Sequence, residues 1–453
     1  MQFVANGVSG VSGRYAFPSL NEHELAQYAI DNRLPPAAAE YLATVHGARI
    51  NRTRGLHALD RPENLTEAGW GVVCHENEDP AVLNNLQPLL KHRKVGRDRI
   101  FRYKDGETVF DWLTRYRTDA GVVNPERVPY YLLLAGSPAR IPFEFAQDLD
   151  AVYCVGRLCF ADPANYGRYA EAVISDETAT TPPAPREAVF LGTQHPGDAN
   201  TEASAQRLIR PLYENSFRAG RRASCSLGDE VNLNRFRQDL GGGPVAPAFV
   251  LAAAHGVEFP CGDPHQRTEQ GALVCNDWRP GGIAPTQFFS AADVDASANL
   301  SGAIACAFAC YGGGTPAMDP LVQNPVALAP EPFVSALAES LLSLKGGPAL
   351  AFIGHVGRAL GFSFLTPNSD SVLDCFNVLV DRICSSQPAG LALDGFNAKY
   401  AALSVQLERL RRNRQLGANV PDEKFATTWL ACNDAGGCML FGDPAVRLRP
   451  GTL

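Results

Sequence analysis

The sequence predicts an α/β fold with a mainly parallel sheet that carries helices on both faces. Short apolar runs of strand length recur along the chain, and glycine ends several of them. Helical patterns of about ten or more residues separate these runs. Strands that alternate with helices are typical of parallel sheets, because a parallel crossover needs a helix-length connection.

Size and composition bound the possible functions. The chain has 453 residues, which exceeds one ordinary hydrophobic core, so we expect two or three subdomains. A hydrophobic content of 45% and a charged content of 19% are typical of a soluble globular protein. The net charge of -8 gives no general attraction to nucleic acid or to an anionic membrane, so we expect neither as a partner. No apolar run reaches about 18 residues, which argues against a transmembrane helix.

Cysteine usage indicates the compartment. The 12 cysteines are dispersed, and several lie inside apolar runs. The first residues show no basic region followed by an apolar core, so we expect no signal peptide. Reduced thiols in a cytoplasmic protein are therefore the expectation, and a catalytic thiol would stay reduced there.

The first part of the chain divides into two regions. Residues 1–65 are polar and mixed, with helical candidates at residues 21–32 and 36–46, and no role is assigned to them. Residues 66–185 are expected to form a smaller α/β subdomain that ends in a helix and an exposed linker rich in Thr and Pro. Its expected strands are residues 69–75, 128–136 (continued by 141–145) and 151–158, and its helices are residues 81–91 and 109–116.

Residues 186–453 are expected to form a larger domain with a helical extension at its C-terminal end. The alternation of strands and helices is most regular here. The expected strands are residues 187–193, 247–254, 302–309, 348–354 and about 438–441, and the expected helices are residues 201–217, 233–240, 332–344 and 396–412.

Two of these strands end in reactive residues. One runs into His255 and Gly256, and another runs into Cys310, which is followed by Tyr311 and three glycines. Ligands bind at the carboxyl ends of strands in open α/β sheets, so we expect both side chains at one sheet edge. An imidazole and a thiol at that edge are a candidate base and nucleophile. Cys306, inside the same apolar run as Cys310, is expected to be inert core.

These motifs resemble those of caspase-like cysteine peptidases. His255 precedes Cys310 by 55 positions, and caspases carry their His about 50 residues before the Cys. Within these peptidases, the chain resembles the gingipain, clostripain and CHAT-domain group. Residues 130–158 resemble the region that precedes the catalytic domain of gingipain-like bacterial peptidases. The segment from Gly442 to Pro444 resembles the end of that domain, so the resemblance spans about residues 66–448.

The resemblance implies both a fold and a reaction. It implies a caspase-like catalytic domain preceded by a degenerate caspase-like subdomain. The activity would be a cysteine endopeptidase that hydrolyses peptide bonds in protein substrates without a cofactor. Cys310 would be the nucleophile and His255 the proton donor and acceptor. The N–H groups of Gly256 and Cys310 would form the oxyanion hole. The group uses a dyad with no obligatory third acid, so no orienting carboxylate is nominated.

The resemblance also implies where substrate specificity arises. In this group three loops choose the residue before the cut: one after the first strand of the domain, one around the cysteine and one after a later strand. The matching loops contain five candidate residues: His195, Asp198, Asp319, His355 and Arg358. An acidic pocket led by Asp198 would select Arg or Lys. Arg358 pointing into the pocket would instead select an acidic residue.

Metal chemistry is the rival interpretation of the reactive residues. His255, Cys261, His265 and Cys275 are zinc-ligand types, but their spacings match no compact zinc pattern. No compact calcium loop is evident either. We therefore expect no metal site.

Three functions remain open. The first is a cytoplasmic endopeptidase of bacterial defence, switched on by an upstream signalling protein or activating protease, with residues 176–185 and 261–277 as sites of cleavage or gating. The second is a catalytically silent caspase-like scaffold whose residues 1–185 contact a partner. The third is a thiol hydrolase or transferase that acts on a small amide.

Overall fold

The computed structural model describes residues 2–3, 20–21, 61–121, 123–243, 245–279, 282–319, 326–366 and 371–453. The two helices predicted before residue 50 fall on residues outside these ranges, apart from Asn21. The chain divides into two units. One comprises residues 1–53 and 409–420, in which β1 (Gln2–Phe3) pairs antiparallel with β2 (Leu20–Asn21). The other comprises residues 54–408 and 421–453 and contains the candidate site.

A ten-stranded sheet organises the larger unit, in the order β4-β3-β5-β6-β16-β15-β12-β9-β7-β8. Neighbouring strands are parallel throughout, except where β15 meets β16. Two parallel halves therefore run in opposite directions and meet at that pair. The predicted mainly parallel α/β fold is confirmed. The strands are β3 (Trp70–His75), β4 (Ile100–Tyr103), β5 (Tyr131–Ala135), β6 (Cys154–Leu158), β7 (Ala188–Gly192), β8 (Ala223–Leu227), β9 (Phe249–Ala253), β12 (Ile304–Phe308), β15 (Ala351–His355) and β16 (Cys438–Gly442).

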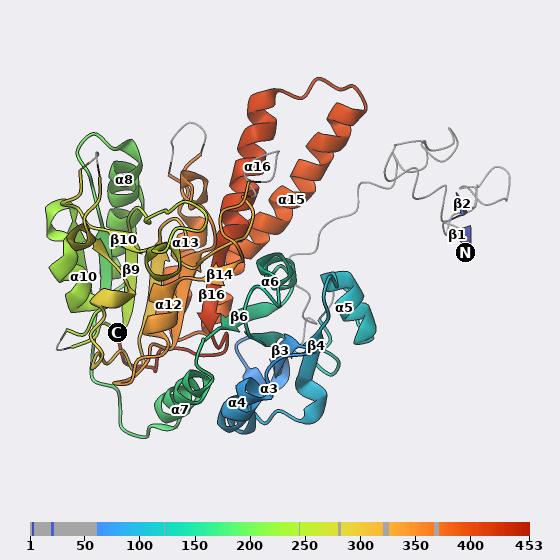
Figure 1. The fold of residues 1–453 in the computed structure, drawn as a ribbon, viewed down its shortest axis with the longest axis horizontal. Helices are drawn as coiled ribbons and strands as arrows, with labels where there is room; N and C mark the ends of the chain where they lie inside the picture. Colours follow the sequence, from blue (N-terminus) through green and yellow to red (C-terminus); the bar gives the residue numbers. More distant parts are fainter. Residues whose placement is uncertain are drawn as a thin grey trace. The chain divides into compact units, whose positions relative to one another are not determined.

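The central strands are apolar because both of their faces are covered. Every residue of β5, β7, β9 and β15 is buried. Helices flank the sheet (Figure 1), and strands with two covered faces read as continuous apolar runs in the sequence. These strands were accordingly the ones that the sequence predicted best.

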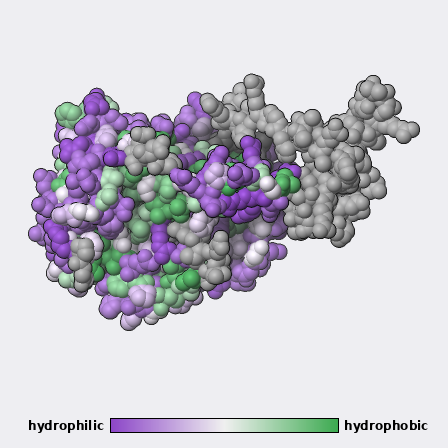
Figure 2. Space-filling view, turned by 90° about the horizontal axis from the view of Figure 1, so that it is seen from above, coloured by the Kyte–Doolittle hydropathy of each residue, from purple (hydrophilic) through white to green (hydrophobic). Residues whose placement is uncertain are grey.

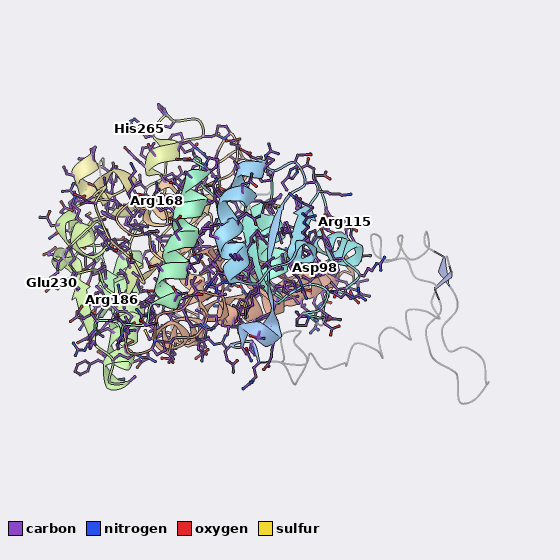
Figure 3. The ribbon with its side chains drawn as sticks, turned by 90° about the horizontal axis from the view of Figure 1, so that it is seen from below. Asp98, Arg115, Arg168, Arg186, Glu230 and His265 are labelled. Atoms are coloured by element: carbon purple, nitrogen blue, oxygen red, sulfur yellow. The ribbon has the colours of Figure 1, made fainter. Side chains whose placement is uncertain are left out.

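Helices connect the strands in both halves. In Figure 3, α7, which carries Arg168, lies beside α4, and the contacts between these two helices are extensive. The helices are α3 (Leu65–Ala68), α4 (Pro80–His92), α5 (Val109–Arg115), α6 (Phe143–Asp150), α7 (Ala164–Thr178), α8 (Ala199–Ser204), α9 (Arg210–Arg218), α10 (Leu233–Asp239), α11 (Gln266–Glu269), α12 (Ala336–Leu341), α13 (Asp374–Cys384), α14 (Ala389–Ala392), α15 (Asp394–Gln415) and α16 (Asp422–Gly437).

One predicted strand extension forms a helix instead. Residues 141–145 were expected to continue the strand that is now β5, but they begin helix α6. Pro142 is the N-cap of this helix and Glu144 lies in its first turn. A carboxylate in the first turn favours a helix start because it faces the positive end of the helix dipole. The run Ile141–Phe145 is too short for its apolar pattern to distinguish a helix from a strand.

The sheet crosses the predicted domain boundary at residue 185. The linker after α7 leads directly into β7 of the second half, while β16, from near the end of the chain, lies between β6 and β15. The buried carboxylate of Asp443 follows β16 and accepts hydrogen bonds from Trp70 (2.8 Å) and Arg93 (2.8 and 3.0 Å). Tyr169 donates to the carbonyl of Leu350 (2.5 Å), so the two halves are joined by polar contacts as well as by strand pairing.

No helix in the described part of the chain is long and apolar enough to cross a lipid bilayer. On the face seen in Figure 2, polar residues predominate and apolar residues form scattered groups. Scattered apolar surface residues are normal in folded proteins.

Candidate active site

Strand register brings His255 and Cys310 to one edge of the sheet. Strand β9 pairs parallel with both β7 and β12, and Ala253 faces Gly192 on one side and Phe308 on the other. His255 lies two residues beyond Ala253, and Cys310 lies two residues beyond Phe308. Because Ala253 and Phe308 face each other and each chain continues for the same two residues, His255 and Cys310 lie next to each other at the carboxyl ends of adjacent strands.

The two loops touch through their backbones at Gly256. A β-carbon on Gly256 would lie 1.8 Å from the carbonyl oxygen of Cys310 and 3.1 Å from its amide nitrogen. Only glycine fits such an approach, because the obstructing atoms are backbone. Within the described residues, the N–H groups of Gly256 and Cys310 donate to no backbone carbonyl. Amides that have no backbone acceptor are candidates for binding an oxyanion.

A tight turn presents the Cys310 side chain. The N–H of Gly312 donates to the carbonyl of Ala309 (3.2 Å), and Tyr311 has a φ of 58°, in the left-handed region. This conformation costs a non-glycine residue about 1–2 kcal/mol, so other contacts must hold it. The N–H of Tyr311 donates to Gly357 (2.6 Å), and its buried hydroxyl donates to Glu258 (3.0 Å). The turn is thus fixed on both sides of the thiol.

The Cys310 thiol is half-buried and lies 3.6 Å from the carbonyl oxygen of Ala359, to which it donates. Burial raises the pKa of this thiol above its ordinary value. The resting side chain is therefore a neutral thiol at neutral pH. A base must remove its proton before or during an attack on a substrate, because the thiolate is the nucleophilic form.

Asp198 provides a partner for that base. Its carboxylate lies 2.5 Å from His255 Nε2 and caps helix α8 by accepting from the N–H of Asn200 (3.0 Å). The Thr201 hydroxyl also donates to it (2.9 Å). Burial alone would raise the pKa of Asp198, but these hydrogen bonds outweigh it and hold the pKa below its usual value. The ionised carboxylate therefore accepts the Nε2 proton of His255, which leaves Nδ1 for proton exchange.

This arrangement differs from two expectations. No orienting carboxylate was nominated, because the resembling peptidases use a dyad, and Asp198 was expected to be the acid of the specificity pocket. The carboxylate instead faces the imidazole of His255. Its position at the N-cap of the helix after β7 is a recognisable sequence signal, but the contact with His255 depends on the pairing of β7 with β9.

His195 lies in the same loop as Asp198 but does not face a substrate groove. Its ring is buried (3% exposed), and its Nε2 atom lies 3.0 Å from the carbonyl oxygen of Cys275. The ring centroids of His195 and His255 are 5.7 Å apart, and Trp278 packs edge-on against both rings. Burial lowers the pKa of His195. The buried ring therefore offers little surface for the contact with substrate that was expected of His195.

His355 is also buried. Its ring is 2% exposed, and Nε2 lies 3.0 Å from the carboxylate of Asp434, which is fully buried. Phe308 packs against the ring edge-on at a centroid distance of 5.6 Å. His355 joins β15 to α16 as a buried polar pair, so little of its ring is open for the specificity role that was expected of it.

Asp319 and Arg358, the other two specificity candidates, do come together. Arg358 pairs with Asp319 and, at 3.0 Å, with Glu258. Asp319 and Arg358 also line a hollow of about 90 Å³ that Glu144 borders. Sequence reasoning missed Glu258, although a carboxylate two positions after Gly256 was a visible signal.

The residues considered for zinc do not gather. His265 pairs with Asp263 at the surface, Cys261 is exposed, and burial raises the pKa of Cys275 to about 12. Among the described residues, one cluster of metal-ligand types comprises His195, Asp198 and His255, whose ligand atoms all lie within 4.8 Å of one another.

No family model matches the sequence, and no curated protein matches it significantly. Among solved structures, a protein described only as a protease is similar at 13% identity, with a TM-score of 0.48 over 84% of this chain and 78% of the other. The complex of Porphyromonas gingivalis RgpB pro- and mature domains is similar at 13% identity, with a TM-score of 0.46 over 84% and 80%. The Saccharomyces cerevisiae separase–securin complex is similar at 9% identity, with a TM-score of 0.35 over 70% of this chain and 16% of the other.

Proposed function

We propose that this protein is a cysteine endopeptidase that cleaves peptide bonds in protein substrates. One observation carries the proposal: the loops of His255 and Cys310 pack backbone to backbone at Gly256, with two amides available there. Asp198 lies 2.5 Å from His255 Nε2 and completes a nucleophile, a base and an orienting acid. All TM-scores above are below 0.5, so the proposed chemistry rests on these residues alone.

The reaction follows from the protonation states. Cys310 rests as a thiol, so Nδ1 of His255 takes its proton as the sulfur attacks the scissile carbonyl carbon. The N–H groups of Gly256 and Cys310 stabilise the oxyanion, an interaction whose loss typically costs about 3–4 kcal/mol in the barrier. Asp198 stabilises the imidazolium that forms. His255 then protonates the leaving amine, and water hydrolyses the thioester to release the second product and the thiol.

The charges around Arg358 favour a basic residue before the cut. One guanidinium is shared by two carboxylates, those of Glu258 and Asp319, and Glu144 borders the same hollow. The surplus of negative charge would attract the side chain of Arg or Lys. An acidic side chain would have to displace both carboxylates from Arg358. We therefore propose that Arg358, Glu258 and Asp319, rather than Asp198, form the specificity pocket.

A fluorogenic peptide panel tests the activity and the pocket together. Peptides with Arg, Lys, Asp, Asn or Leu before the cut would be offered to wild type, Cys310→Ala and His255→Ala. Cys261→Ala is the control, because this cysteine is exposed and lies outside the site. We expect turnover of the Arg or Lys peptides that is lost in the first two variants and kept in the control. Equal turnover by Cys310→Ala would refute the cysteine mechanism.

Pocket variants then test the specificity. In Glu258→Gln and Asp319→Asn we expect kcat/KM to fall for Arg and Lys peptides and to change little for Leu peptides. If wild type cleaves Asp peptides faster than Arg peptides, Arg358 would instead bind the substrate side chain, and the proposed preference for a basic residue would be wrong.

We further propose that the peptidase is an effector of bacterial defence that works in the cytoplasm and is switched on by an upstream signalling protein or protease. All 12 cysteines are free, which fits a reducing compartment. The linker after α7 is exposed over residues 179–182, where cleavage is feasible. Intact-mass measurement of active and inactive preparations tests this switch. Identical full-length chains in both would refute activation by cleavage.

A further inference from the structure

We propose that His195, Asp198 and His255 form a Zn²⁺ site that holds the enzyme inactive. The inference rests on the proposed peptidase function for its effect, but the site itself is a matter of geometry. Two imidazoles and a carboxylate are a common ligand set for zinc, with a water in the fourth position.

The three side chains already converge. The ligand atoms lie within 4.8 Å of one another, with Asp198 Oδ2 at 2.5 Å from His255 Nε2 and at 3.9 Å from His195 Nδ1. Zinc bonds of about 2.0–2.2 Å in a tetrahedral site place ligand atoms roughly 3.3 Å apart. Each pair therefore needs to shift by about 1.5 Å or less.

His195 is prepared as a ligand. The carbonyl oxygen of Cys275 can only accept, so the proton of neutral His195 lies on Nε2, 3.0 Å away. Nδ1 then carries a lone pair, and it is buried without a hydrogen-bond partner in the described part of the chain. An unsatisfied buried acceptor is costly, and this one faces the oxygen of a carboxylate. A cation between them would satisfy both.

The surroundings also suit a bound metal. Metal-ligating histidines usually donate their other N–H to a carbonyl or carboxylate, as His195 does to Cys275. Thr201 donates to Asp198 and orients it (2.9 Å). Trp278 covers both imidazole rings. In the proposed peptidase mechanism, the unpaired Nδ1 atom of His195 and the packing of Trp278 over the two rings have no role.

Bound zinc would exclude catalysis. The metal would occupy Nε2 of His255 and displace its proton to solvent, so Asp198 would no longer hold the ring as a proton carrier. Zinc binding and peptide hydrolysis would therefore be mutually exclusive uses of one histidine. Removal of zinc by a chelator would restore the imidazole and its proton.

The binding test uses Cys310→Ala, in which the nucleophilic thiol cannot ligate the metal. Equilibrium dialysis with Zn²⁺ alone, and the visible absorption of Co²⁺ in the same site, would measure binding without any activity. We expect one Zn²⁺ per chain. A second substitution, His195→Gln, keeps a donor for the Cys275 carbonyl but removes Nδ1, and Asp198→Asn keeps the helix cap but removes the anionic ligand. Each should weaken binding by about 100-fold or more.

The control is His265→Gln in the same background. His265 lies at the surface (Figure 3) and pairs with Asp263, so its loss should leave zinc affinity unchanged. Absence of binding to Cys310→Ala, or equal binding by the His195→Gln form, would overturn the site. Reversible inhibition of wild-type turnover by Zn²⁺ is the second expected result. Binding without any wild-type turnover would refute the peptidase proposal and the inhibitory role but keep the metal site. Turnover without binding would keep the peptidase proposal but refute the metal site and its inhibitory role.

Discussion

Replacement of Asp198 by Asn tests the catalytic geometry most directly. Asn caps a helix about as well as Asp, so α8 should persist. What changes is the partner of His255 Nε2: an anionic oxygen at 2.5 Å becomes part of a neutral amide. The imidazolium that forms when His255 accepts the thiol proton would lose its counter-charge.

The size of the effect follows from this single contact. A hydrogen bond to a charged group contributes about 1.5–3 kcal/mol, which corresponds to a fall in kcat of about 10- to 150-fold. The His255 side chain is 35% exposed, so solvent screening moves the expectation toward the lower end. KM should change little, because the charge develops only during the reaction.

The assay is steady-state turnover of peptides with Arg, Leu or Asp before the cut. Asp79→Asn is the matched control: Asp79 caps α4 in the other half of the sheet by accepting from Ala81 (2.9 Å). We expect kcat of Asp198→Asn to fall equally for all peptides that wild type cleaves. A loss confined to the Arg peptide would return Asp198 to the specificity pocket, and unchanged kcat would refute its positioning role.

Three further outcomes are expected. Gly256→Ala should lower the unfolding free energy by about 1–3 kcal/mol and abolish turnover, because the added β-carbon would clash with the Cys310 backbone. Thermal unfolding measures the loss. Gly361→Ala is the control, because the nearest atom to its added β-carbon belongs to a side chain, at 3.4 Å. Asp443→Asn should lower the unfolding free energy by about 1.5–3 kcal/mol in urea titration, since Arg93 would lose one buried charged partner and keep the other, Glu177. Asp381→Asn, which breaks only a surface pair, should cost less than about 1 kcal/mol, and equal losses would contradict this account. The rate of Cys310 alkylation should reach half its maximum above pH 8.5, because burial raises the thiol pKa above its ordinary value of about 8.5. A midpoint below about pH 8.5 would contradict this and indicate a resting thiolate.

The sequence predicted the interior of the sheet well and its edges poorly. Strands β4 and β8 were missed, and they are the two end strands of the sheet. β4 alternates between half-buried and buried positions and includes Arg102, while β8 contains Ser224 and Ser226. A strand with one open edge does not need a continuous apolar run, so composition alone does not distinguish it from a loop.

The residues of the candidate site were likewise predictable only in part. His255 and Cys310 could be proposed from sequence because each follows its own strand, and local pattern determines where a strand ends. The roles of Asp198 and Glu258 depend on which strands and loops become neighbours. That neighbourhood is set by the register of the sheet and by the packing of Arg358, and neither is encoded within a local window of residues.

The place of β16 has a consequence for biosynthesis. All other strands of the sheet precede Cys438 in the chain, yet β16 lies in the middle of the sheet, between β6 and β15. While the ribosome is still translating residues before 438, the nascent chain has two half-sheets with open edges and no strand to bridge them. The loops that follow β9 and β12 are translated before β16, so the sheet that carries them is completed only when residues 438–442 have been made.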